Sequence, residues 1–231
     1  MPSKVLQLFE LGRAIARLPV ARLEFRRELN PDDVAKMHRY FTKRHPRYLV
    51  FQNKSLGAAL IDLSKFASQD AYMDTVKGSN SAAALTAKAR KKGYRVVEID
   101  RNDYIDHIDN INNSVGERQG RPMDASYREK VLHFANEKNY IYLGVLNPDG
   151  DLVSYINLGL YGNFVAIDRV LGLRNNDGIM HLLLTEAVTR LLKEGKVRYF
   201  MYDTCFGASP GLLKFKTMLG FTPYRAKFSI R

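Results

Sequence analysis

The chain has 231 residues, of which 45% are hydrophobic and 26% charged. This composition excludes disordered and collagen-like chains, and a single cysteine excludes an internal disulfide and a cysteine-based zinc site. Lys and Arg number 36 against 24 Asp and Glu, which gives a formal net charge of +12. The excess favours an anionic partner: a nucleic acid, a phosphorylated small molecule or an acidic membrane surface.

The first fifth of the chain is its most basic part. Residues 1–50 hold eleven Lys and Arg against five Asp and Glu, which form either a solvated face or an anion-binding one. Within them, residues 4–18 carry apolar side chains at helical spacing and predict an amphipathic helix that ends at Pro19. That helix either packs on the body of the protein or makes peripheral contact with a membrane.

Neither a secretory signal nor a membrane-spanning helix is expected. Residues 1–18 lack the uninterrupted apolar run and the cleavage site of a secretory signal. No apolar run elsewhere reaches the roughly 18 residues that a spanning helix needs. We therefore expect a cytoplasmic protein.

Capping residues and periodicity predict the elements before residue 140. Asn30 precedes Pro31 and two acids, which is typical of a helix start, and this helix is expected to reach about Lys43. Patterning then predicts strands over 47–51, 57–63 and 94–99, and helices over 70–92, with a break at 78–81, over 102–115 and over 125–136.

The last ninety residues show the clearest pattern. The turn at 147–150, Asn-Pro-Asp-Gly, joins two apolar segments and predicts a hairpin of strands 140–146 and 152–160. After it we expect a strand over 163–171, a helix over 177–194 that ends at Gly195, a strand over 197–202, a helix over 209–219 and a strand over 222–230. Without an internal repeat or composition break, we expect a single α/β domain over 51–231 and a basic helical extension over 1–50.

This order of elements resembles the C-terminal two-thirds of the GNAT N-acyltransferase fold. Residues 215–224 are similar to the Lys-x-x-Leu-Gly-Phe-x-Pro segment that many members carry before their last strand. Residues 84–96, a basic helix with a glycine and a strand, and the loop 117–122 resemble the FemABX branch. The resemblance covers roughly residues 70–231. It implies an α/β (α+β) fold with a mixed, mostly antiparallel central sheet flanked by helices, plus an N-terminal helical extension.

The resemblance also implies an N-acyltransferase, which moves an acyl or aminoacyl group from an activated donor to a primary amine without a tightly bound cofactor. FemABX proteins transfer amino acids from aminoacyl-tRNA to amines of peptidoglycan precursors, whereas relatives use acyl-CoA or acyl carriers. The donor would be CoA-borne, tRNA-borne or borne by an acidic carrier protein, and the acceptor a small-molecule or cell-envelope amine. The alternative is a non-catalytic basic module that binds RNA or a membrane.

Donor binding is predicted around the start of the helix at 177–194. The pyrophosphate loop of CoA-dependent members keeps only Arg174 and Gly178 here, which, with the basic surface, favours tRNA or a carrier protein over CoA. Backbone N–H groups at that helix start would bind phosphate, unless Asp177 occupies them as an N-cap. Arg118 and Arg121 suit an anionic donor or acceptor, or else lie solvated in their loop.

Acyl transfer needs a deprotonated amine, a stabilised oxyanion and a proton for the leaving group. In the GNAT fold two adjacent parallel strands splay apart beside the acyl group, and here we expect them to be 152–160 and 197–202. Three polar residues of these strands are candidates: Asn157, Tyr202 and Asp203. Asp203 would orient or deprotonate the amine, or else cap the next helix. Tyr202 would protonate the leaving group, or else pack in the sheet.

Two consecutive residues of the last helix complete the candidate site. By the family resemblance, Lys216 would bind a donor phosphate or stabilise the oxyanion, and Phe215 would pack against the donor. An exposed lysine on an amphipathic helix is the alternative. Cys205 has no histidine partner in any nucleophile motif, and the sequence contains no metal-ligand pattern, phosphate-binding loop or hydrolase elbow.

Overall fold

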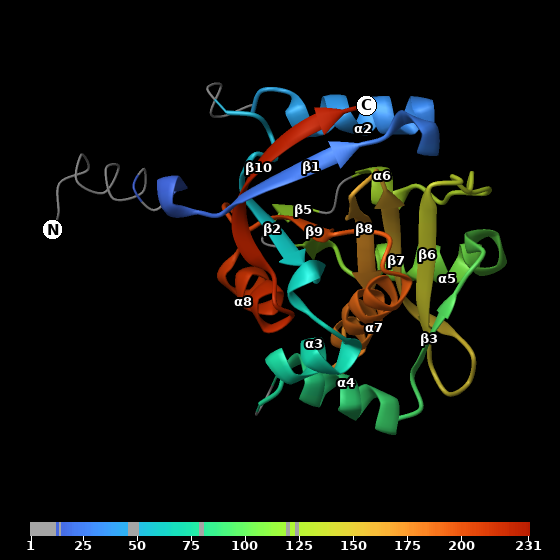
Figure 1. The fold of residues 1–231 in the computed structure, drawn as a ribbon. Helices are drawn as coiled ribbons and strands as arrows, with labels where there is room; N and C mark the ends of the chain where they lie inside the picture. The colour runs from blue at the N-terminus through green and yellow to red at the C-terminus, as the bar shows by residue number, and fades with distance from the viewer. Residues whose placement is uncertain (1–12, 14, 46–50, 79–80, 119–120, 123–124) are drawn as a thin grey trace, which may run out of the picture.

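One eight-stranded sheet organises the computed structural model, which describes residues 13, 15–45, 51–78, 81–118, 121–122 and 125–231 (Figure 1). Its strands are β1 (Val20–Phe25), β2 (Leu56–Asp62), β3 (Arg95–Glu98), β6 (Tyr140–Leu146), β7 (Leu152–Leu160), β8 (Phe164–Gly172), β9 (Tyr199–Thr204) and β10 (Thr222–Ile230). Their order is β1-β10-β2-β9-β8-β7-β6-β3. Only β1 with β10 and β8 with β9 pair in parallel.

Helices cover both faces of this sheet. The α-helices are α2 (Pro31–Thr42), α3 (Gln69–Thr75), α4 (Ala82–Lys91), α5 (Ile105–Asn113), α6 (Ala125–Arg128), α7 (Ile179–Glu194) and α8 (Pro210–Met218). Short 3-10 helices occupy Arg27–Leu29, Leu63–Lys65 and Arg101–Tyr104, and a separate hairpin pairs β4 (Glu117–Arg118) with β5 (Arg121–Pro122). Helices α3, α4 and α7 share a core with one face, whereas α2 and α5 pack in two separate clusters on the other. The mixed, mostly antiparallel sheet flanked by helices is thus confirmed.

Most predicted elements lie where their capping and periodicity indicate. The Asn30 side chain accepts a hydrogen bond from the Asp33 N–H at the start of α2, and Ser81 caps α4 after the expected break. The hairpin strands β6 and β7 and the final strand β10 have the predicted bounds. The strand predicted over 47–51 and the helix predicted over 4–18 fall largely outside the described residues. The membrane contact considered for that helix therefore stays a prediction.

The helix expected over 125–136 is wrong beyond Arg128. Asn102 explains the difference, because its side chain pairs with the backbone of Phe134 as a neighbouring strand would. The Phe134 N–H donates to Asn102 Oδ1 at 2.9 Å, and Asn102 Nδ2 donates to the Phe134 carbonyl at 3.1 Å. These bonds replace the helical partners of this segment.

Strand β1 is a further difference, since a helical extension alone was expected before residue 50. Its alternating residues Ala21, Leu23 and Phe25 are buried, while β10 pairs with it in parallel. Its other edge contacts the β7–β8 turn, where the Arg26 N–H donates to the Tyr161 carbonyl at 2.7 Å. Residues 20–25 therefore belong to the main sheet. The boundary at residue 50 falls among residues outside the described part and stays a prediction.

The β7–β8 turn approaches β1 so closely that only glycine fits there. A Cβ atom on Gly162 would lie 2.1 Å from the Glu24 carbonyl oxygen. This contact holds β1 against the turn, so strands β1, β10, β2, β9 and β8 curl around one apolar cluster that α2 covers.

Within the described residues, no helix combines the length and apolar character that crossing a bilayer requires.

Candidate active site

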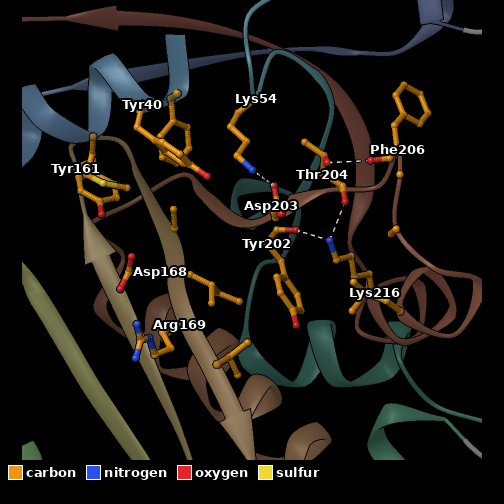
Figure 2. Close-up of a pocket in the computed structure, with 18 of the residues that line it drawn as sticks. Tyr40, Lys54, Tyr161, Asp168, Arg169, Tyr202, Asp203, Thr204, Phe206 and Lys216 are labelled. Carbon is orange, nitrogen blue, oxygen red and sulfur yellow. Dashed lines mark hydrogen bonds and ion pairs between the residues drawn. The ribbon is translucent and has the colours of Figure 1, made fainter. Parts of the chain in front are cut away.

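The two parallel strands β8 and β9 separate after a short paired stretch. They pair only over Phe164–Ala166 and Tyr199–Met201. Beyond it β8 follows β7 and β9 follows β2. The sequence predicted that β7 would splay apart from β9. This prediction is wrong, because the antiparallel meander places β8 between the two strands. A cleft of about 1020 Å³ opens where β8 and β9 diverge, walled also by α2 and α8 (Figure 2).

Both diverging strands carry an irregularity that presents an aspartate to this cleft. In β8, Leu158 pairs with Ile167 but Asn157 pairs with Arg169, so Asp168 is an extra residue. In β9 the register with β2 shifts between Met201 and Thr204, the stretch that contains Asp203. Bulges of this kind re-aim side chains at a sheet's rim. Both aspartates line the cleft.

Asp203 has a strained backbone and an ion-pair partner. Its φ of 52° makes it the one non-glycine residue with positive φ in the described part of the chain. Lys54 donates to its carboxylate at 2.5 Å, and Figure 2 shows the two side chains directed at each other. Helix α8 is capped instead by Ser209. The alternative role of Asp203 as a helix cap is thus excluded, and the strained, polar position is typical of functional sites.

Lys216 is buried rather than exposed, with 1% of its surface accessible. Its Nζ donates to the carbonyl oxygens of Tyr202 and Thr204, each at 2.8 Å, and lies 4.5 Å from the centre of the Tyr202 ring. An ammonium group has three N–H donors, so these two carbonyls leave one for a ligand. Figure 2 shows the side chain rising from α8 to the end of β9. The result is a positive charge in a desolvated position at the cleft.

Burial lowers the pKa of Lys216 below its usual value of 10.5, and this has a consequence for stability. Between the lowered pKa and 10.5 the unfolded chain binds more protons than the folded chain, so the free energy of unfolding rises with pH there. We expect this rise in the wild type and not in Lys216→Met. Urea unfolding of both proteins at several pH values up to 10.5 measures the difference. Parallel pH profiles would contradict the prediction.

A second cavity of about 670 Å³ lies at the N-terminus of α7. Three predicted donor-binding residues line it: Arg174, Gly178 and Phe215. Phe215 and Lys216 are consecutive on α8 and line different cavities. The end of α8 therefore lies between the second cavity and the cleft at the splay.

Asp177 does not cap α7, contrary to the alternative considered for it. Gly178 is the N-cap residue, with a φ of 85° and no side-chain cap. Asp177 instead forms an ion pair with Lys92 and accepts a hydrogen bond from the Tyr94 hydroxyl at 2.9 Å. These hydrogen bonds, that of Lys92 foremost, lower its pKa. Among the residues that the structure describes, no side chain caps the first-turn N–H groups of α7, which leaves them to an anion.

No protein-family model matches the chain, and neither does any curated protein. Among solved structures, FemX aligns with a TM-score of 0.56 and 11% identity, over 73% of this chain and 59% of that one. The C-terminal domain of a putative lysylphosphatidylglycerol synthetase from Agrobacterium fabrum aligns with a TM-score of 0.50 and 15% identity, over 72% and 57%. The fold is GNAT-like and FemABX-related. A conserved protein of unknown function from Bacteroides thetaiotaomicron shares it, with a TM-score of 0.54, 13% identity and coverage of 74% and 58%.

The chain spans less than two thirds of each of these proteins. At identities of 11–15%, these structural alignments show a shared fold and no more than that. In this fold, Tyr202, Asp203 and Lys216 gather at the cleft as a group. Their catalytic roles stay predictions.

Asn157, in contrast, does not line the cleft. It lies within β7 between Tyr142 and Arg169, and its buried Oδ1 has no hydrogen-bond partner in the described part of the chain. The prediction that Asn157 lies at the splay is wrong, because β8 and not β7 lies beside β9.

Cys205 is buried, and burial raises the pKa of its thiol, which disfavours a nucleophile.

The β4–β5 hairpin lies beside the second cavity. Arg174 donates to the Glu117 carbonyl at 3.5 Å, so the loops predicted to bind the donor adjoin each other. The side chains of Arg118 and Arg121 lie outside the described residues, and donor binding by them stays a prediction.

Three cleft residues escaped the sequence analysis. Asp168 and Arg169 are two consecutive charged residues inside an otherwise apolar strand, and this interruption was a usable signal. Lys54 had none, because its loop shows no periodicity and its partner Asp203 is distant in sequence.

Proposed function

We propose that this chain is an N-acyltransferase that moves an acyl or aminoacyl group from an activated donor to a primary amine, with the splay between β8 and β9 as the reaction centre. The observation that carries the proposal is the buried ammonium of Lys216 at the end of α8, between the two cavities. A fixed positive charge in a desolvated site stabilises developing negative charge far better than one in water.

The two cavities suggest that the donor and the acceptor bind in separate places. A donor whose phosphate lies at the uncapped start of α7, near Arg174, would extend its acyl group past Phe215 toward the splay. The acceptor amine would enter through the larger cleft and attack the carbonyl carbon. The remaining N–H of Lys216 would donate to the oxygen as it gains negative charge. Asp203, held by Lys54, would orient the amine.

For the donor we favour aminoacyl-tRNA or an acylated acidic carrier protein over acyl-CoA. Both are large anions, and a chain with a net charge of +12 attracts them over long distances. The loop before α7 keeps only Arg174 and Gly178 of the pyrophosphate motif, which argues against a CoA site. For the acceptor we propose a small-molecule or cell-envelope amine, for which a cleft of about 1020 Å³ has room.

A donor screen tests the proposal. The full chain is incubated with a mixture of primary amines and, separately, with labelled aminoacyl-tRNA, acylated carrier protein or acyl-CoA, and amide products are sought by mass spectrometry. We expect amide formation with at least one donor and its loss in Lys216→Met. Salt-sensitive tRNA binding without amide from any donor would contradict the proposal and favour the non-catalytic binding module.

A further inference from the structure

The two carboxylates of the cleft differ in what they already bind. Asp203 is engaged by Lys54 at 2.5 Å. The side chain of Asp168, on the opposite side of the splay, forms no hydrogen bond or ion pair with any residue in the described part of the chain, and it is exposed to the cleft. One aspartate is thus neutralised within the protein, and the other is available to a ligand.

Two of the basic residues that line the cleft with Asp168 do not pair with it, namely Arg169 and Lys36. Its neighbour Arg169 lies over the Tyr127 ring, with the guanidinium carbon 4.0 Å from the ring centre. Lys36 of α2 lines the cleft but forms no ion pair with it. Two other carboxylates, those of Asp33 and Glu137, accept hydrogen bonds from side-chain amides. Asn139 Nδ2 donates to Asp33 Oδ2 at 2.9 Å, and Asn30 Nδ2 donates to Glu137 Oε2.

The charge of Asp168 acts on three neighbouring groups, Asp33, Tyr140 and Tyr161. Burial raises the pKa of Asp33, and the carboxylates of Glu137 and Asp168 raise it further. Burial likewise raises the pKa of Tyr140 and of Tyr161, and the charge of Asp168 adds to both. The Asn139 amide and Lys36 lower the pKa of Asp33 and so offset part of this repulsion. A cation bound at Asp168 would reduce what remains.

We propose that Asp168 binds the ammonium group of the acceptor and receives a proton from it. This inference rests on the proposed acyl transfer and adds to Asp203, which orients the amine, a second carboxylate that binds its charge. The β8 bulge places Asp168 at the splay, where the amine must attack. An acceptor without a positive charge would lack this contact, so the site selects cationic amines.

The proton balance follows from the reaction. The acceptor enters as an ammonium ion and first gives up one proton, which frees the lone pair of its nitrogen. That nitrogen then forms a bond to the carbonyl carbon, and the bond from that carbon to the donor oxygen or sulfur breaks. The nitrogen loses two protons in total. One passes to the Asp168 carboxylate and from this exposed side chain to solvent, and the other goes to the departing oxygen or sulfur.

Amine binding tests the inference without turnover. Cadaverine, a diamine that is cationic at neutral pH, is titrated into the ¹⁵N-labelled full chain, and 1,5-pentanediol serves as the neutral probe of equal length. We expect saturable amide shifts over Ala166–Val170 with cadaverine and none with the diol. Asp168→Asn should weaken cadaverine binding by about tenfold, the loss typical of a charge-assisted hydrogen bond.

Asp149→Asn is the matched control, because Asp149 is exposed in the β6–β7 turn. It should bind cadaverine as the wild type does. Equal binding by wild type and Asp168→Asn, or shifts confined to other strands, would overturn the inference. Cadaverine binding at β8 without amide formation from any donor would instead overturn the proposed function and leave the amine site standing.

Discussion

Lys216→Met is expected to lower kcat for acyl transfer by about 10²–10³-fold, the loss typical of removing one oxyanion donor. Methionine has a similar length and fills the buried space without the charge. The substitution leaves the carbonyls of Tyr202 and Thr204 without their present donor, but both lie at a cleft that water can enter. The desolvation cost of the buried ammonium also disappears. The fold should therefore persist while the rate falls, as single-turnover kinetics at saturating donor would measure.

Lys214→Met provides the control for this substitution. Lys214 is exposed on the same helix, so its replacement changes net charge and helix composition equally without touching the cleft. Its kcat should match that of the wild type. Similar kcat values for Lys216→Met and the wild type would show that Lys216 only ties α8 to β9.

Gly178→Ala is expected to lower the free energy of unfolding by about 2–4 kcal/mol, through left-handed strain and an added steric clash. A Cβ atom at this position would lie 2.4 Å from the Leu85 carbonyl oxygen of α4. Backbone cannot yield as a side-chain end can, so α4 must move away from the start of α7. Urea unfolding measures the loss.

Gly195→Ala isolates the strain from the clash. Gly195 ends the same helix with a φ of 62°, yet a Cβ atom there would meet nothing within 4 Å. Its substitution should cost only about 1 kcal/mol. Equal losses at both ends of α7 would mean that α4 adapts without cost and would refute the packing argument.

Local signals predicted the C-terminal half of the fold closely. The hairpin followed from its Asn-Pro-Asp-Gly turn, and β10 has the bounds that alternation and the preceding Leu219-Gly220 predicted. Such signals act within a few residues, through turn conformations, caps and side-chain alternation. The family resemblance, in contrast, brought Tyr202, Asp203 and Lys216 into the candidate site before any geometry was known.

Interactions between distant segments could not be predicted in this way. The helix assigned to 129–136 failed because the Asn102 side chain takes over its backbone, and the Asp177 cap failed because Lys92 binds that carboxylate. Both competitors lie more than thirty residues away in sequence, so no local pattern revealed them. The β8 bulge likewise depends on register with β7.

By itself, the sequence determined the class of fold, most elements and three residues of the cleft, because these depend on short-range periodicity and on a motif carried within one helix and strand. Only the tertiary structure decided which strand lies beside β9, that Lys216 is buried, and that Asp203 is paired while Asp168 is not. Those properties arise when residues such as Lys54 and Asp203, 149 positions apart, meet in space. Desolvation and pairing, which govern the chemistry of a charged group, are set by such meetings.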